Sequence, residues 1–243
     1  MIWIRVAQGL LIASIALCLA VAAVSVFVFD VDRATASTCA TIVFFSAIVG
    51  LLSTPWWPVA TQRGRPHFES LQGMVMIWFG IAFLIHVTWE FGWVVFRDSI
   101  RVSPDSIWAY PWWVYIDGGD ARYASGSAVV VAIETMTVAN GVLGLSALWL
   151  RHRSGGRSSL ATLILMATAV VHLYGTAIYL GTEALDGYPN VRTTSFIDFA
   201  VKFWLLNGIW LVMPWTVLYW GKQTLYEQLG SSGQSAGRGF RPD

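Results

Sequence analysis

Long apolar stretches alternate with short polar segments along this chain, and the apolar stretches predict its fold. A helix that crosses a membrane needs about 20 mostly apolar residues. Six stretches reach roughly that length, at residues 3–29, 38–60, 72–96, 126–150, 158–181 and 195–220. The pattern therefore predicts an all-α fold, a polytopic transmembrane helical bundle of about six spans.

The first two stretches differ from the others. The apolar run at 3–29 is longer than the roughly 7–15 residues of a signal-peptide core, so we expect it to stay as a membrane helix. The stretch at 38–60 contains Pro55 and Pro58 around two tryptophans, which is typical of a helix that ends at the membrane interface. Basic residues are more frequent on the side that would hold both termini, which predicts that both termini face inward.

Composition narrows the class of protein. Charged residues make up 12% and hydrophobic residues 56% of the 243 residues, with a mean hydropathy of +0.60. Since soluble domains are about one quarter charged, the chain is expected to lie in a lipid bilayer. A formal net charge of +1 gives no field that would gather nucleic acid. Cys18 and Cys39 make no disulfide framework or zinc spacing, so we expect no metal and no cofactor.

Ionisable side chains inside the apolar stretches are the candidates for chemistry, because each costs roughly 2.5–3.5 kcal/mol in a membrane. His86 and Glu90 are four residues apart, and Glu134 and Thr137 are three apart, so each pair shares a helix face. Such groups can also join helices by hydrogen bonds. Two carboxyl groups and a histidine exceed what that purpose requires, which favours a function.

Three more side chains fit a structural explanation as well as a functional one. Asn207 and Trp210 are three residues apart in the last stretch. Asparagine commonly joins membrane helices, and the tryptophan lies among several others. His172 in the fifth stretch is better explained as a packed or hydrogen-bonded residue than as a catalyst.

This set of groups suits proton movement within an apolar site. Burial away from water favours the protonated form of a carboxyl group, and a neighbouring histidine can relay that proton. Protonation of an alkene makes a carbocation, which an indole face stabilises. The set therefore suits isomerisation of an alkene in an apolar lipid. It would also suit a proton-coupled transporter, although the chain has no evident inverted repeat or pair of broken helices.

Five short motifs then occur in order between about residues 72 and 220. They are His86-Val-Thr-Trp-Glu90, Gly119-Asp-Ala-Arg-Tyr123, Glu134-Thr-Met-Thr137, Tyr174-Gly-Thr-Ala-Ile-Tyr179 with Thr182-Glu-Ala-Leu-Asp-Gly187, and Asn207-Gly-Ile-Trp-Leu-Val-Met-Pro214. Together they resemble the emopamil-binding protein family, the EXPERA-domain proteins that include sterol Δ8-Δ7 isomerases. The resemblance implies a membrane enzyme with a sterol-shaped cavity that opens towards the bilayer.

The resemblance also implies roles for individual residues. A proton is added at sterol C9 and another is lost from C7. The pair His86 and Glu90 matches the family's catalytic pair and is the expected donor, with Glu134 as acceptor; the reverse assignment is equally compatible with the sequence. The substrate-binding residues implied by the resemblance are Tyr123, Thr137, Asn207 and Trp210.

The chain also departs from the family pattern. The family core has five spans, so the first helix is an addition, and Thr176 replaces the aspartate of the family's Tyr-Gly-Asp motif. We expect N-terminal transmembrane helices at 1–61, an EXPERA-like catalytic membrane domain at 62–225 and a flexible C-terminal tail at 226–243.

The expected substrate is a sterol or another polycyclic terpenoid. The alternatives to a sterol isomerase are a terpenoid cyclase or isomerase of specialised metabolism with the same acid–base residues, and a non-catalytic sterol-binding protein. The expected membrane is that of the endoplasmic reticulum in a eukaryote or the plasma membrane in a bacterium, and a homodimer is compatible with the sequence.

Overall fold

The computed structural model describes residues 2–57 and 67–237, which are mostly helical and contain no strand in these ranges. The elements are α1 (Ile2–Phe29), α2 (Arg33–Ser53), the 3₁₀ turn η1 (Thr54–Trp56), α3 (His67–Ile85), the π-helical turn η2 (His86–Glu90), α4 (Phe91–Arg101), α5 (Tyr110–Ile116), α6 (Arg122–Ser125), α7 (Ala128–Arg153), α8 (Ser159–Leu185), the π-helical segment η3 (Ile197–Leu205) and α9 (Leu206–Gly237).

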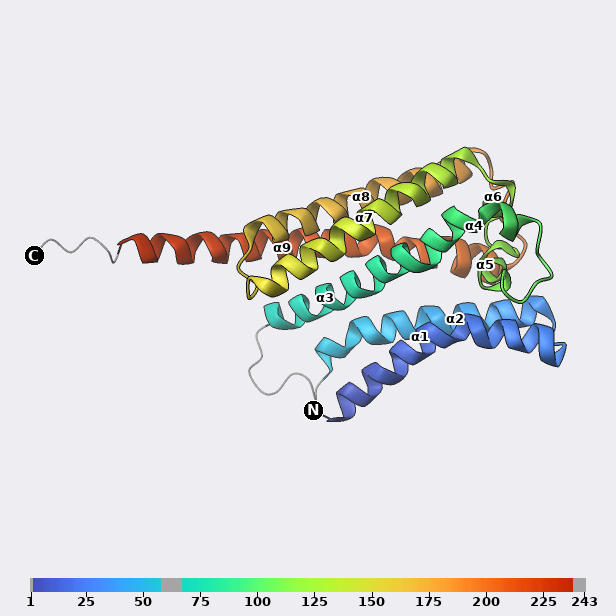
Figure 1. The fold of residues 1–243 in the computed structure, drawn as a ribbon, viewed down its shortest axis with the longest axis horizontal. Helices are drawn as coiled ribbons and strands as arrows, with labels where there is room; N and C mark the ends of the chain where they lie inside the picture. Colours follow the sequence, from blue (N-terminus) through green and yellow to red (C-terminus); the bar gives the residue numbers. More distant parts are fainter. Residues whose placement is uncertain (1, 58–66, 238–243) are drawn as a thin grey trace, which may run out of the picture.

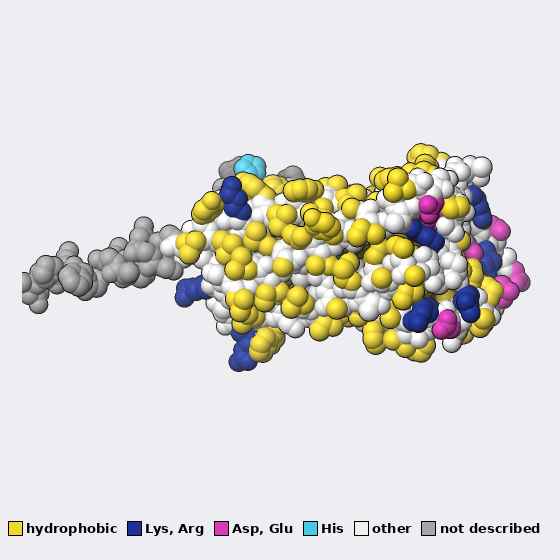
Figure 2. Space-filling view, turned by 90° about the horizontal axis from the view of Figure 1, so that it is seen from above, with side chains coloured by type: hydrophobic (Ala, Val, Ile, Leu, Met, Phe, Trp, Pro, Cys, Tyr) yellow, Lys and Arg dark blue, Asp and Glu magenta, His cyan; other side chains and the backbone are white. Residues whose placement is uncertain are grey.

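Six helical segments are long and apolar enough to cross a membrane, which confirms the expected bundle. They are Trp3–Phe29, Arg33–Trp56, His67–Arg101, Ala128–Arg153, Ser159–Leu185 and Ile197–Leu229. Large apolar side chains cover the sides of the bundle, and Figure 2 shows charged side chains gathered towards its two ends. Because such an apolar surface would be unfavourable in water, the chain is a multi-pass membrane protein.

The helices form an elongated bundle with short elements at one end. Helices α1 and α2 make an antiparallel hairpin that lies beside α3, while α8 packs against both α7 and α9. The beginning of α1 and the end of α9 lie at one end of the molecule, and α5 and α6 lie at the other (Figure 1). Because the number of spans is even, the first and last spans have their outer ends on the same side of the membrane.

Two glycines on α7 let it approach the helix that carries the first predicted pair. A Cβ atom on Gly141 would lie 2.7 Å from Cβ of His86, and one on Gly144 would overlap the ring of Phe83. Real Cβ atoms do not come so close, so only glycine fits at these two positions. The absence of side chains there brings His86 against α7, where Glu134 and Thr137 also lie.

The last helix runs into the stretch expected as a C-terminal tail. Helix α9 continues to Gly237, and Gln228 Nε2 donates to the carbonyl of Gly156 at 3.0 Å while Ser159 Oγ donates to Gln228 at 2.8 Å. These contacts join α9 to the turn between α7 and α8, and the expected division into three segments stays a prediction. The expected boundary at 61/62 and the end of the expected tail, 238–243, lie outside the described residues.

Candidate active site

A cavity of about 880 Å³ lies inside the bundle, within the range of roughly 300–1,000 Å³ for ligand pockets. Its wall draws on α1, α2, α3, α5, α7, α8 and α9, and it is mostly apolar. All the site residues expected from the sequence line it: His86, Glu90, Tyr123, Glu134, Thr137, Asn207 and Trp210.

The cavity reaches the side of the bundle that faces lipid. Two of its lining residues, Ile12 on α1 and Leu84 on α3, are also 55% and 56% exposed. The lining therefore continues onto the exposed surface of these two helices. A molecule dissolved in the bilayer could enter the cavity there without passing through water.

His86 and Glu90 form a direct contact inside the cavity wall. They are the first and last residues of η2, where the helix widens into a π turn, a feature often found at functional sites. His86 Nδ1 lies 2.6 Å from Glu90 Oε2. Thr137 Oγ1 on α7 donates to the same oxygen at 2.6 Å, so two donors from two helices can stabilise a carboxylate at Glu90.

Glu134 lies in the same wall and has a different environment. The Tyr123 hydroxyl on α6 donates to Glu134 Oε1, while Glu134 Oε2 is buried and has no hydrogen-bond partner in the described part of the chain. Burial, and then the nearby charge of Glu134, raise the pKa of Tyr123 well above its usual value. Tyr123 therefore remains a hydrogen-bond donor, and one oxygen of Glu134 is available to a ligand.

The structure adds His172 to this group, which the sequence analysis treated as a packed residue. His172 lines the cavity from α8, and its Nε2 lies 2.8 Å from His86 Nε2. The two residues are 86 positions apart in the chain, so their spacing could not reveal the contact. The only signal was an ionisable residue within an apolar stretch.

A second set of hydroxyl groups closes the end of the cavity. Tyr115 on α5 shares a hydrogen bond of 2.7 Å with Tyr179 on α8, and Asn207 donates to Tyr115 at 3.0 Å. Tyr115 lies in an aromatic stretch between two apolar runs, a composition typical of a loop at the membrane interface. The loop instead folds into α5 and covers the cavity, and burial followed by the charge of Asp120 raises the pKa of Tyr115.

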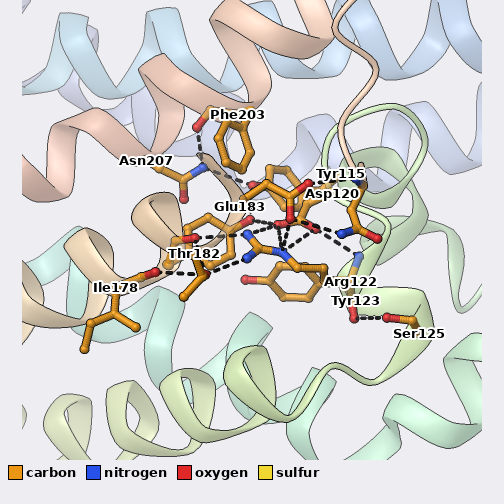
Figure 3. Close-up of polar contacts among 12 residues, drawn as sticks. Tyr115, Asp120, Arg122, Tyr123, Ser125, Ile178, Thr182, Glu183, Phe203 and Asn207 are labelled. Carbon is orange, nitrogen blue, oxygen red and sulfur yellow. Dashed lines mark hydrogen bonds and ion pairs between the residues drawn. The ribbon is translucent and has the colours of Figure 1, made fainter. Parts of the chain in front are cut away.

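Buried charges behind these tyrosines hold the closing segments in place (Figure 3). Tyr179 donates to Asp120, and Arg122 lies 2.7 Å from Asp120 Oδ2 and 3.2 Å from Glu183 Oε2. Burial alone would lower the pKa of Arg122, but the hydrogen bonds and charge of Asp120, with the charge of Glu183, raise it. The guanidinium therefore stays charged and joins α6 to α8.

Trp210 supplies an aromatic surface to the cavity. Its ring packs edge-on against Trp78, with 4.8 Å between ring centroids, and lies 6.4 Å from the ring of His86. Indole faces attract cations within about 6 Å of the ring. This wall could therefore stabilise a positive charge in a ligand held next to His86.

The fold and this cavity define a class: helical membrane proteins that enclose an apolar cavity next to buried acidic groups. Residues 109–221 match the model of the EXPERA family, the expanded EBP superfamily. This match and the relatives described next support the resemblance of the chain to the emopamil-binding protein family.

Characterised relatives cover most of the chain. The 3-beta-hydroxysteroid-Delta(8),Delta(7)-isomerase of Rattus norvegicus is 26% identical over 70% of this chain and 72% of its own length. A protoglabretal synthase of Ailanthus altissima is 28% identical over 64% of this chain and 69% of its own length. An isomeliandiol synthase of the same plant is 25% identical over 58% of this chain and 65% of its own length.

Proposed function

We propose that this chain is a membrane-embedded isomerase that moves a double bond in a sterol-like polycyclic lipid from Δ8 to Δ7. The observation that carries the proposal is the presence of two buried carboxyl groups, Glu90 and Glu134, in the wall of one apolar cavity that reaches the lipid-facing surface. The names of the relatives in rat and other mammals support the same reaction.

The first step of the proposed reaction adds a proton. In a Δ8 substrate the double bond joins C8 and C9. Glu90 gives its proton to C9, the π electrons form the new C–H bond, and C8 becomes a cation. The carboxylate left on Glu90 is stabilised by His86 and by Thr137 at Oε2, because a hydrogen bond to a charged group is stronger than one between neutral groups.

The second step removes a proton. Glu134 takes it from C7 through its unpartnered oxygen, and the C–H electrons form the C7–C8 double bond. Between the two steps, Trp210 faces the cation and the apolar wall keeps water away from it. The reaction is balanced, because one proton enters and one leaves; the enzyme returns to its starting state when the proton gained by Glu134 is replaced at Glu90.

The decisive experiment is isomerisation in heavy water. Purified protein in detergent receives a Δ8 sterol in deuterated buffer, with Glu134→Gln as the matched control, since this variant keeps the side-chain shape without a proton acceptor. We expect a Δ7 sterol that carries one deuterium from the wild type and none from the variant. Normal turnover by Glu134→Gln would overturn the proposed mechanism.

A second candidate is isomerisation or cyclisation of another polycyclic terpenoid by the same residues. The plant relatives named protoglabretal synthase and isomeliandiol synthase favour it. If the Δ8 sterol is unchanged, such terpenoids are the next substrates to offer. A protein that binds sterols and terpenoids but converts none of them would be a non-catalytic relative.

The proposal extends to the membrane in which the protein lies and to its oligomeric state. We place the protein in the endoplasmic reticulum membrane of a eukaryotic source or in the plasma membrane of a bacterial one, with cell fractionation as the test. The apolar sides of the bundle are compatible with a homodimer, which native mass spectrometry in detergent would detect at twice the mass of one chain.

A further inference from the structure

His172 occupies a position that the proposed reaction does not require. It is 1% exposed and comes from α8, and it approaches His86 from the side opposite to Glu90. The three side chains form a line in which Glu90 contacts His86 Nδ1 and His172 contacts His86 Nε2. Since neutral histidine has one donor and one acceptor nitrogen, the state of one contact fixes the other.

Two arrangements of protons are compatible with these contacts when both histidines are neutral. In the first, His172 donates from Nε2 to His86 Nε2, and His86 donates from Nδ1 to Glu90. In the second, the direction is reversed along the whole line: a protonated Glu90 donates to His86, His86 donates to His172, and His172 carries its proton on Nδ1.

The buried Nδ1 of His172 decides between them. This atom has no hydrogen-bond partner among the described residues. In the second arrangement it would be a buried N–H donor without an acceptor, which is rare in proteins. In the first arrangement it carries only a lone pair, and every N–H of the two rings has an acceptor. The first arrangement also matches Glu90 Oε2, which already accepts from Thr137.

We propose that His172 is a positioning residue that holds His86 as the Nδ1–H tautomer, so that His86 always donates to Glu90. This inference rests on the proposed function, in which Glu90 becomes a carboxylate after it protonates the substrate. A donor fixed before the reaction stabilises that charge without rearrangement. His172 itself does not contact the reacting atoms.

Two variants of His172 test the proposal, because one keeps an N–H donor at this position and the other does not. His172→Gln retains an N–H that can donate to His86 Nε2, whereas His172→Leu retains bulk only. We expect the leucine variant to lower kcat roughly 10- to 100-fold with little change in KM, which is the size of loss found when the partner that orients a metal-bound histidine is removed. The glutamine variant should stay within about threefold of the wild type.

A control on the same helix separates this effect from a general disturbance. Thr168 lies one turn before His172, is fully buried, and donates only to the carbonyl of Leu165. Thr168→Val therefore removes a buried hydroxyl from the same face without removing the hydrogen bond between His172 and His86. This variant should keep the kcat of the wild type.

Nitrogen-15 NMR of histidine-labelled protein gives a readout that does not depend on turnover. The chain has only 4 histidines. In the wild type and in His172→Gln we expect His86 protonated at Nδ1, and in the wild type His172 protonated at Nε2; in His172→Leu the proton of His86 should distribute over both nitrogens. A wild-type His172 protonated at Nδ1, or a leucine variant with normal kcat, would overturn the proposal. If the wild type moves no double bond, the proposed function fails, while the spectra still decide the tautomers.

Discussion

The hydroxyl of Tyr123 donates a hydrogen bond to one oxygen of Glu134. The other oxygen of that carboxyl group is buried and has no hydrogen-bond partner within the described ranges. Tyr123 belongs to the short helix α6, whereas Glu134 lies in the membrane-length helix α7. The orientation of the proposed proton acceptor is therefore determined by a segment at one end of the bundle.

Replacing Tyr123 by phenylalanine should remove the hydrogen bond that orients the carboxyl group of Glu134. A hydrogen bond to a charged group contributes about 1.5–3 kcal/mol, so we expect Tyr123→Phe to lower kcat roughly 10- to 100-fold. Single-turnover kinetics with the Δ8 sterol measures this change. Tyr174→Phe is the control, because Tyr174 is 69% exposed on α8. An unaffected kcat in Tyr123→Phe would show that the hydroxyl does not assist Glu134.

A lipophilic amine should inhibit the reaction, because its protonated form resembles the carbocation and mimics of a reaction's transition state bind tightly. Trp210→Leu should weaken binding of the amine more than it weakens binding of an uncharged carbon analogue of the same shape. The expected difference is about 2- to 30-fold, corresponding to roughly 0.5–2 kcal/mol for a cation over an indole. Competition binding measures the loss of affinity for each compound. Because both compounds lose the same packing against Trp210, the ratio of the two losses reports the effect of the charge alone. Equal losses for the two compounds would contradict a cation at this wall.

The first helix should determine access to the cavity. Ala13 and Ala16 on α1 are both exposed, but only Ala16 lines the cavity. Ala16→Trp should raise KM by about tenfold or more, since overpacking disturbs a formed site, while kcat changes less. Ala13→Trp should leave both constants near those of the wild type. Equal kinetics in the two variants would mean that α1 does not bound the substrate.

The charges behind the cavity should be needed for stability. Arg122→Met leaves Asp120 and Glu183 buried without their cation, and breaking a buried ion pair costs about 3–5 kcal/mol. We expect a clearly lower Tm in detergent. Asp105→Asn is the control, because the Asp105 side chain is 88% exposed in its pair with Arg33 and such pairs contribute about 0–1 kcal/mol. Similar Tm values for both variants would refute this role.

Stability should also fall at alkaline pH. Burial raises the pKa of Tyr110 to about 12 and also raises the pKa values of Tyr115 and Tyr123. In the unfolded chain a tyrosine ionises near pH 10. Above that pH the unfolded state loses protons that the folded state retains, so the free energy of unfolding decreases as pH rises from about 10. Tm measured against pH should fall there, and less steeply in Tyr110→Phe. A flat profile would contradict the prediction.

Most of the fold follows from the sequence because membrane helices are long and apolar. The pair His86 and Glu90 could be recognised for the same reason, since ionisable groups stand out in such stretches. The contact between His86 and His172 depends on how α8 and η2 both pack against α7 and could not be derived from spacing. The π turns at η2 and η3 also left no signal, since helical periodicity assumes a constant number of residues per turn.

The closing segments were the least predictable part of the site. Tyr115 and Asp120 lie in a stretch whose composition indicates an interfacial loop, and nothing local shows that it folds over a cavity. Their positions result from contacts with distant residues, such as Tyr179 and Asn207. Local pattern identifies which groups are costly to bury, whereas tertiary packing determines which of them meet.

The exposed part of the cavity lining, at Ile12 and Leu84, affects how the protein must be assayed. If the substrate enters from the lipid phase, the enzyme responds to the number of substrate molecules per lipid or detergent molecule rather than to their number per litre. Adding detergent at constant substrate should therefore slow turnover by surface dilution. Rates obtained in micelles, nanodiscs and native membranes become comparable only when substrate is expressed as a mole fraction of the amphiphile.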